Sequence, residues 1–324
     1  MTEGLKIYTA ADVATLINHR DGEIKIGQQV QFVASLEDLK NATSRFVLLG
    51  IPEDIGVLAN HGIGGTATAW QPSLKSLLNV QSNAFLKGQE LLLLGHFEIA
   101  APEDTSTQSL QEKVKQIDEL VAPVIAKITA AGKIPIVIGG GHNNAYPIIR
   151  GVSTAKNTAI DVINIDAHAD LRAPQGRHSG NGFSYAIKDG FLKNYVIFGL
   201  HQSYNNDAMI TEIAKNDDIH ALFFDDLIQS NQPLEFYWRK LFKDVNGTPG
   251  LEIDLDCITD MLSSAMTPSG FSLNEIRKLV LTSPYNFSYL HICEGAVELT
   301  DGRTSSTTAK AISYLITDFI KSQQ

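Results

Sequence analysis

Short, continuous apolar runs recur along this chain and are separated by longer segments of mixed polarity. Such runs are typical of central strands that are buried on both faces of a parallel sheet. We therefore expect about eight strands. They lie in the runs Phe46–Leu49, Leu91–Leu94, Ile134–Ile138, Val162–Ile165, Tyr195–Phe198, Ala221–Phe224, Leu251–Ile253 and Leu290–Cys293.

Helical periodicity lies between several of these runs. The clearest case is Leu110–Ala131, where apolar residues recur every three or four positions. Leu273–Leu281 is a second helix, with Ser272 as its N-cap and Glu275 placed to complete a capping box. Thr308–Lys321 is predicted to be a C-terminal helix. This alternation predicts an α/β fold of three layers, with helices on both faces of a mostly parallel, doubly wound sheet.

The chain has no internal repeat, no low-complexity segment and no convincing linker. Its 324 residues suit one large α/β domain, so we expect a single domain over residues 1–324. The first 40 or so residues are less regularly patterned. We predict that they form an N-terminal extension packed on the sheet.

Polar clusters directly follow three of the expected strands. The first cluster is Asp166-Ala167-His168-Ala169-Asp170, whose three polar side chains would share one face if the strand continued. Open α/β sheets place their sites beyond the carboxyl ends of strands, so we expect the three clusters to meet. Together they supply six candidate metal ligands, namely His142, Asp166, His168, Asp170, Asp254 and Asp256.

Two imidazoles and four carboxylates are enough to ligate two divalent cations. A donor set of mostly hard oxygen atoms, without Cys, favours Mn²⁺ over Zn²⁺. Two such cations, roughly 3.5–4 Å apart, can share a water molecule and lower its pKa. The sequence therefore predicts a hydrolytic centre with two Mn²⁺ ions per subunit.

Composition narrows the classes of function. The net charge of −10 gives nucleic-acid binding no general electrostatic support. Cys257 and Cys293 do not form a CxxC pair, which argues against a zinc ribbon or a disulfide scaffold. The N-terminal residues lack a signal-peptide core, and no apolar run is long enough to span a membrane. We expect a cytoplasmic protein that acts on a small molecule, without nucleic-acid or membrane partners.

The motifs, taken as an ordered set, resemble those of the arginase/agmatinase/formimidoylglutamase family, the ureohydrolases. The resemblance extends from about Val47 to about Glu298. Gly139–His142 resembles the family's GGDH-type loop, Asp166–Arg172 its DAHxDxR motif, and Asp254–Asp256 its DxD motif. Gly50–Val57 and Asn60–Thr66 resemble the loop that rims the pocket, and Leu290–Glu294 resembles the last strand.

This resemblance implies an arginase-like fold and a dimanganese centre held by the six candidate ligands. Asp170 and Asp254 stand where bridging carboxylates occur in the family. Glu294 would face the substrate and pair with a planar cationic group. The implied reaction is attack of a metal-bridged hydroxide on a C=N carbon, with Asp170 placed to accept the proton and with Glu294 as the second catalytic residue.

The loop Arg177–Phe183 guides the choice of substrate, because it resembles the family's SSGNxH loop. Ser179 and Asn181 are expected to hold substrate carboxylates. Phe183 stands where arginases carry a proton-shuttling His, and an aromatic residue at this position is similar to formimidoylglutamases. Gly199–Tyr204 lacks the acidic residues that arginases carry in the corresponding segment. The resemblance therefore implies hydrolysis of N-formimidoyl-L-glutamate to L-glutamate and formamide, a step of histidine degradation.

Other interpretations remain open at this stage. The chain could be a guanidino hydrolase that releases urea, or a catalytically silent metal-binding scaffold. Gly139–Gly141 would also suit a tight turn or a phosphate cradle, although the chain has no GxGxxG. His178 and His201 are either proton shuttles or hydrogen-bonded loop residues. Arg172 is expected to tie its loop to a carboxylate. Family relatives are often oligomeric, so a homo-oligomer is also open.

Overall fold

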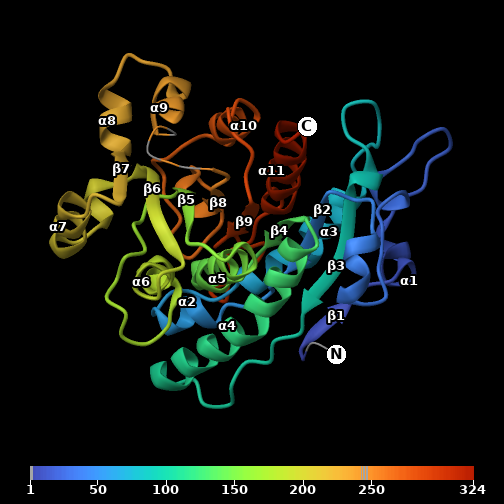
Figure 1. Ribbon diagram of the computed structural model, residues 1–324, viewed down its shortest axis with the longest axis horizontal. Helices are drawn as coiled ribbons and strands as arrows, with labels where there is room; N and C mark the ends of the chain where they lie inside the picture. The colour runs from blue at the N-terminus through green and yellow to red at the C-terminus, as the bar shows by residue number, and fades with distance from the viewer. Residues whose placement is uncertain (1–2, 242, 244, 246) are drawn as a thin grey trace.

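The computed structural model describes residues 3–241, 243, 245 and 247–324. These described residues contain one sheet of nine strands in the order β1-β3-β2-β4-β9-β8-β5-β6-β7, which crosses the molecule from right to left in Figure 1. All eight predicted strands are confirmed. They are β2 (Phe46–Gly50), β3 (Leu91–Phe97), β4 (Ile134–Ile138), β5 (Ile160–Ile165), β6 (Leu192–Leu200), β7 (Ile219–Phe223), β8 (Gly250–Asp254) and β9 (Tyr289–Cys293).

The strand that the sequence pattern missed is β1 (Leu5–Ile7). It pairs antiparallel with β3 at the edge of the sheet, whereas the other strand pairs are parallel. With three residues and partial exposure it carries no continuous apolar run, so only its pairing with β3 defines it. Part of the predicted N-terminal extension is therefore a strand of the sheet itself.

The three predicted helices are confirmed, and the capping box of Leu273–Leu281 forms as expected. Ser272 Oγ accepts from the Glu275 backbone N–H at 3.2 Å, and Glu275 Oε2 accepts from the Ser272 backbone N–H at 2.7 Å. The helices are α1 (Ala10–Val13), α2 (Ile55–Ala59), α3 (Trp70–Leu78), α4 (Thr107–Ala130), α5 (Ala145–Lys156), α6 (Gly182–Lys188), α7 (Asp207–Lys215), α8 (Phe224–Gln229), α9 (Leu234–Leu241), α10 (Leu273–Leu281) and α11 (Thr308–Ser322).

Alternate residues of the central strands enter two separate apolar cores, which gives the predicted three-layer fold. In β4, Ile136 and Ile138 pack in the core covered by α3, α10 and α11, whereas Val137 packs in the core under α4, α5 and α6. Figure 1 shows these helices on the two sides of the sheet. Because both faces are covered, side chains reach solvent mainly at the strand ends.

Four neighbouring strands at the centre of the sheet run parallel in the order β4-β9-β8-β5. Their carboxyl ends therefore lie side by side at one edge. Each of the predicted polar clusters follows one of these strands, and so does Glu294, which comes directly after β9. Among the described residues, no helix is both long enough and apolar enough to cross a membrane.

Candidate metal centre

The glycine loop after β4 brings His142 to the edge of the sheet. Gly139 and Gly140 have φ values of 90° and 76°, a region that side-chain-bearing residues rarely adopt. A Cβ on Gly141 would lie 2.6 Å from Asn143 Oδ1 and 2.9 Å from Val57 Cγ2, so the Asp of a GGDH-type loop would require these side chains to shift. The carboxylate at this loop comes instead from buried Glu53, whose Oε1 accepts from the Gly141 backbone N–H at 3.0 Å.

Spacing by two residues orients the first aspartate of the other two clusters. Asp166 Oδ1 accepts from the His168 backbone N–H at 2.7 Å, and Asp254 Oδ1 accepts from the Asp256 backbone N–H at 2.8 Å. In both turns the second oxygen atom, Oδ2, remains to face His142. The expectation that Asp166, His168 and Asp170 continue a strand is wrong, because β5 ends at Ile165 and Asp170 has a φ of 50°.

The six candidate ligands converge into two adjacent groups. In the first, His142 Nδ1 lies 3.2 Å from Asp166 Oδ2, 3.0 Å from Asp170 Oδ2 and 3.1 Å from Asp254 Oδ2. The second group contains Asp166, His168 and Asp256, with 3.0 Å between His168 Nδ1 and Asp256 Oδ2. Asp166 is shared by both groups, whereas Asp170 belongs to the first alone. Asp166 therefore lies between the two groups, and the bridging roles expected for Asp170 and Asp254 stay a prediction.

Electrostatics show that these groups hold an excess of negative charge. Burial, together with Asp256 and Asp166, raises the pKa of Asp254 well above its ordinary value. Burial acts to lower the pKa of His142 and His168, but the facing carboxylates outweigh it and raise both pKa values. Buried carboxylates at this density need positive charge beside them, supplied by a proton or by a cation.

Glu294 faces the same cavity from the end of β9. It has a φ of 61° and is 7% exposed, and its Oε1 accepts from the His142 backbone N–H at 2.8 Å. Burial raises the pKa of Glu294 to about 8. A non-glycine residue held in this region of φ is uncommon and often occurs at functional sites.

The cavity above the two groups has a volume of about 220 Å³. Ser179 lines it, as predicted, and its Oγ accepts from Asn60 Nδ2 at 3.1 Å. Tyr204 was not predicted, and its ring stacks on His168 with 5.4 Å between centroids. Val57, Asn60 and Gly62 also line it, and they belong to the segments that resemble the family's pocket rim. The lining residues that the sequence did not single out include Asn205, Met209, Ser264 and Ala265. They come from separate loops, so no local motif connects them.

Two residues of the 177–183 loop do not reach the cavity. Asn181 is fully buried, with its Oδ1 accepting from Arg177 and from the His178 backbone N–H and its Nδ2 donating to Gly176 O. The cavity lining does not include Asn181, so this geometry does not support its predicted contact with substrate, which stays a prediction. Phe183 is also fully buried; it stacks on Tyr195 and packs edge-on against His142, 5.0 Å between centroids.

Arg172 lines the cavity instead of tying its loop to a carboxylate. Among the described residues, no carboxylate lies within ion-pair distance of its guanidinium group, so that expectation was wrong. His178 is a hydrogen-bonded loop residue, since its Nδ1 accepts from the Gly180 backbone N–H at 3.1 Å. Burial, with Arg172 nearby, lowers the pKa of His178 to about 4. Neither His178 nor His201 lines the cavity.

The Arginase family model matches residues 44–317, which is most of the chain and includes the whole metal centre. The chain belongs to the Arginase family. It is therefore an enzyme of the class that hydrolyses carbon–nitrogen bonds, as predicted.

Curated relatives of the chain include two bacterial formimidoylglutamases. The protein of Corynebacterium efficiens is 25% identical over 262 residues, which cover 76% of this chain and 75% of the relative. The protein of Streptococcus pyogenes serotype M3 is 26% identical over 226 residues, which cover 67% of this chain and 65% of the relative. The matched part thus spans slightly less than two thirds of the second relative.

Solved structures support the fold. Formiminoglutamase of Trypanosoma cruzi, solved with Mn²⁺, superposes with a TM-score of 0.72 at 20% identity, covering 93% of this chain and 98% of that protein. Formimidoylglutamase of Bacillus subtilis gives 0.75 at 15% identity, with 94% and 93% covered. The proclavaminate amidino hydrolase of Streptomyces clavuligerus gives 0.70 at 13% identity, with 91% and 98% covered. At these identities the likeness establishes the arginase-like fold.

The loop that carries Ser179 is held from below by buried Arg177. Its guanidinium group donates to both oxygen atoms of Asp118 on α4, at 2.8 and 3.1 Å, and to Asn143 O at 2.8 Å. Arg177 also lies 4.9 Å from the ring centroid of Tyr146. Because both charges are buried, removing one would leave the other without its partner.

We predict that Arg177→Ala lowers the free energy of unfolding by about 3–5 kcal/mol, the cost of breaking a buried ion pair. Urea denaturation followed by circular dichroism measures this loss. Arg150→Ala is the matched control, because Arg150 pairs with the neighbouring Glu119 at the surface, where such a pair contributes at most about 1 kcal/mol. Equal losses in the two variants would contradict a special role for the buried pair.

Proposed function

We propose that the protein binds two Mn²⁺ ions and hydrolyses N-formimidoyl-L-glutamate to L-glutamate and formamide. Three observations support this proposal. The two adjacent ligand groups suit a pair of hard divalent cations. Curated relatives include formimidoylglutamases, and one structural neighbour was solved with Mn²⁺. Arg172 places a cation in the wall of an otherwise acidic cavity.

The donor atoms fit the proposed cations. Nδ1 of His142, which faces the carboxylates of the first group, and Oδ1 of Asp256 are buried without a hydrogen-bond partner among the described residues, which is costly unless something else binds them. Carboxylate oxygens with two imidazoles match the preference of Mn²⁺. Cys257 and Cys293, the soft donors that would favour zinc, belong to neither of the two groups that face the cavity.

Two bound cations would supply Lewis acidity and activate water at the cavity floor. The protein's own residues do the rest. Asp170 lines the cavity as a member of the first group, and it would accept the proton of the attacking water. Glu294 projects from β9 and can accept hydrogen bonds from the planar N–C–N group of the substrate, which orients its carbon toward the floor.

Arg172 is the observation that favours glutamate as the rest of the substrate. It is the only Lys or Arg among the described residues that line the cavity, and it has no carboxylate partner there. A guanidinium group pairs best with a carboxylate, and N-formimidoyl-L-glutamate carries two. Ser179 and Asn60 lie on the same wall and add polar contacts. Agmatine has no carboxylate to meet Arg172.

A guanidino acid is the second candidate substrate. Glu294 would pair with a guanidinium group as well as with a formimidoyl group, and arginine or guanidinobutyrate would also offer Arg172 a carboxylate. The arginase-like fold is shared with an amidino hydrolase, so it does not separate these substrates. Identification of the products does.

We expect Mn²⁺-treated protein to release formamide and glutamate from N-formimidoyl-L-glutamate, and to release no urea from arginine, guanidinobutyrate or agmatine. Chromatography of the products with a urea assay measures both outcomes. Release of urea from a guanidino acid would show that the proposed substrate is wrong, while the cavity would remain the proposed active site. Bound Mn²⁺ without turnover of any of the four compounds would favour a catalytically silent scaffold.

Replacing Arg172 by Ala should lower kcat/KM for the substrate by about 10- to 100-fold, the equivalent of one charge-assisted hydrogen bond. The loss should appear mainly in KM, because the bond is made to a part of the substrate that does not react. Arg172→Lys should retain part of the affinity, since it keeps the charge. Arg303→Ala, which removes an exposed arginine paired with Asp301, is the control. An unchanged KM in Arg172→Ala would contradict carboxylate binding by this residue.

The two ligand groups predict how metal content responds to single substitutions. His142→Ala and Asp256→Ala each disrupt one group and should leave about one Mn²⁺ per chain, whereas Asp166→Ala disrupts both and should leave none. Asp170→Ala should behave like His142→Ala. Elemental analysis after dialysis gives the Mn²⁺ content, with Asp301→Asn as the control. Retention of one Mn²⁺ by Asp166→Ala would contradict the shared position of this carboxylate.

A further inference from the structure

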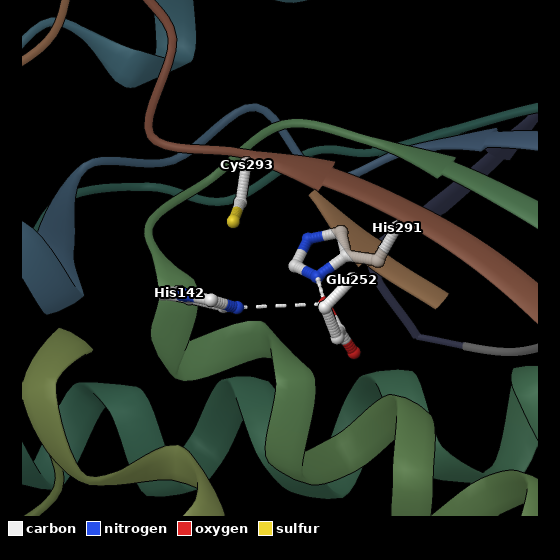
Figure 2. A group of neighbouring side chains, drawn as sticks. All are labelled: His142, Glu252, His291 and Cys293. Atoms are coloured by element: carbon white, nitrogen blue, oxygen red, sulfur yellow. Dashed lines mark hydrogen bonds and ion pairs between the residues drawn. The ribbon is translucent and has the colours of Figure 1, made fainter. Parts of the chain in front are cut away.

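Beneath the cavity, a third group of buried side chains surrounds the far side of His142. It contains His142, Glu252, His291 and Cys293, each at most 1% exposed. Figure 2 shows the imidazole of His142 pointing from the loop after β4 toward Glu252, with His291 held against the same carboxylate. The closest approach of the first pair is 3.6 Å, between His142 Nε2 and Glu252 Oε2.

The two nitrogens of His142 have different surroundings. Nδ1 faces the three carboxylates of the first ligand group, and Nε2 faces Glu252. A ring nitrogen binds a cation through its lone pair, so a cation at Nδ1 requires the proton to be on Nε2. That N–H then needs an acceptor in a fully buried place, and the carboxylate within ion-pair distance of Nε2 is that of Glu252, slightly beyond hydrogen-bond distance in this structure.

Glu252 is itself fixed on both sides. Its Oε1 accepts from the hydroxyl of Tyr289 at 2.7 Å, and its Oε2 lies 2.5 Å from Nδ1 of His291. Glu252 and His291 are register partners on β8 and β9, so the sheet itself sets this contact. Both carboxylate oxygens thus have partners within the protein.

The position of Glu252 has no explanation in the fold alone. It is 0% exposed in the middle of a central strand, where a carboxylate is costly and an apolar residue would pack. Phe183 packs edge-on against the His142 ring but offers no acceptor. Cys293 is a further neighbour of the ring in this group, and Glu252 is the carboxylate of the group that faces Nε2.

We propose that Glu252 is a positioning residue, which accepts the Nε2 proton of His142 and so presents Nδ1 to the first cation, with Tyr289 and His291 holding Glu252 in place. This inference rests on the proposed metal centre. A carboxylate behind a ligating histidine fixes the ring and makes the ligating nitrogen a better donor. Its removal typically weakens metal binding about 10- to 100-fold.

The test is the Mn²⁺ affinity of the full-length, metal-stripped protein, measured by electron paramagnetic resonance of free Mn²⁺ during titration. Glu252→Gln should weaken the affinity by about 10- to 100-fold. Tyr289→Phe, which keeps the carboxylate and removes one of its supports, should produce a smaller loss. The matched control is Asp318→Asn, because Asp318 is a buried carboxylate that pairs with Arg277 and belongs to none of the three groups.

Coupling separates positioning from a merely structural effect. If Tyr289 acts through Glu252, adding Tyr289→Phe to Glu252→Gln should weaken Mn²⁺ binding no further. A Mn²⁺ affinity of Glu252→Gln within twofold of that of the parent protein would overturn the inference. So would a parent protein that binds a third Mn²⁺ ion which Glu252→Gln alone loses, because Glu252 would then be a ligand. If the parent protein binds no Mn²⁺, the proposed function fails with it; if only Glu252→Gln is without effect, the proposed function stands.

Discussion

Repulsion between buried carboxylates is the constraint on which the site depends. The parallel strands β4, β9, β8 and β5 end at one edge of the sheet, so the residues that follow them are forced into one small volume. Asp166, Asp170 and Asp254 meet there around a single imidazole. Burial, with neighbouring carboxylates, raises the pKa of Asp170 and Asp254, whereas the facing histidines lower the pKa of Asp166. A fold that retains such a group in a buried place needs positive charge to stabilise it.

The same constraint gives the cavity its polarity. Its floor is acidic, with Asp254, Asp256 and Glu294, whereas Arg172 lies in the wall. A substrate that is cationic or polarisable at one end and anionic at the other matches this arrangement. N-formimidoyl-L-glutamate has that form. Phe183, at the position where the resemblance places the shuttle histidine of arginases, packs edge-on against the candidate ligand His142.

Features that depend on local pattern could be predicted from the sequence. Continuous apolar runs identified the eight long strands, and the spacing of polar residues directly after them identified the six candidate ligands that converge. Features that depend on tertiary contacts could not. β1 exists only because Leu5–Ile7 pairs with β3. Asn181 has the residue type of a substrate contact, but Arg177 and Gly176 O use its amide groups. The proposed role of Glu252 depends on its contact with His291, which lies on another strand.

The central claim is that the strand ends build two adjacent cation sites with Asp166 between them. Anomalous scattering at the manganese edge, from crystals soaked in Mn²⁺, tests it most directly. We expect two peaks, one beside His142 and Asp170 and the other beside His168 and Asp256, each in contact with Asp166. A single peak, or a peak confined to the Glu252, His291 and Cys293 group, would contradict the claim.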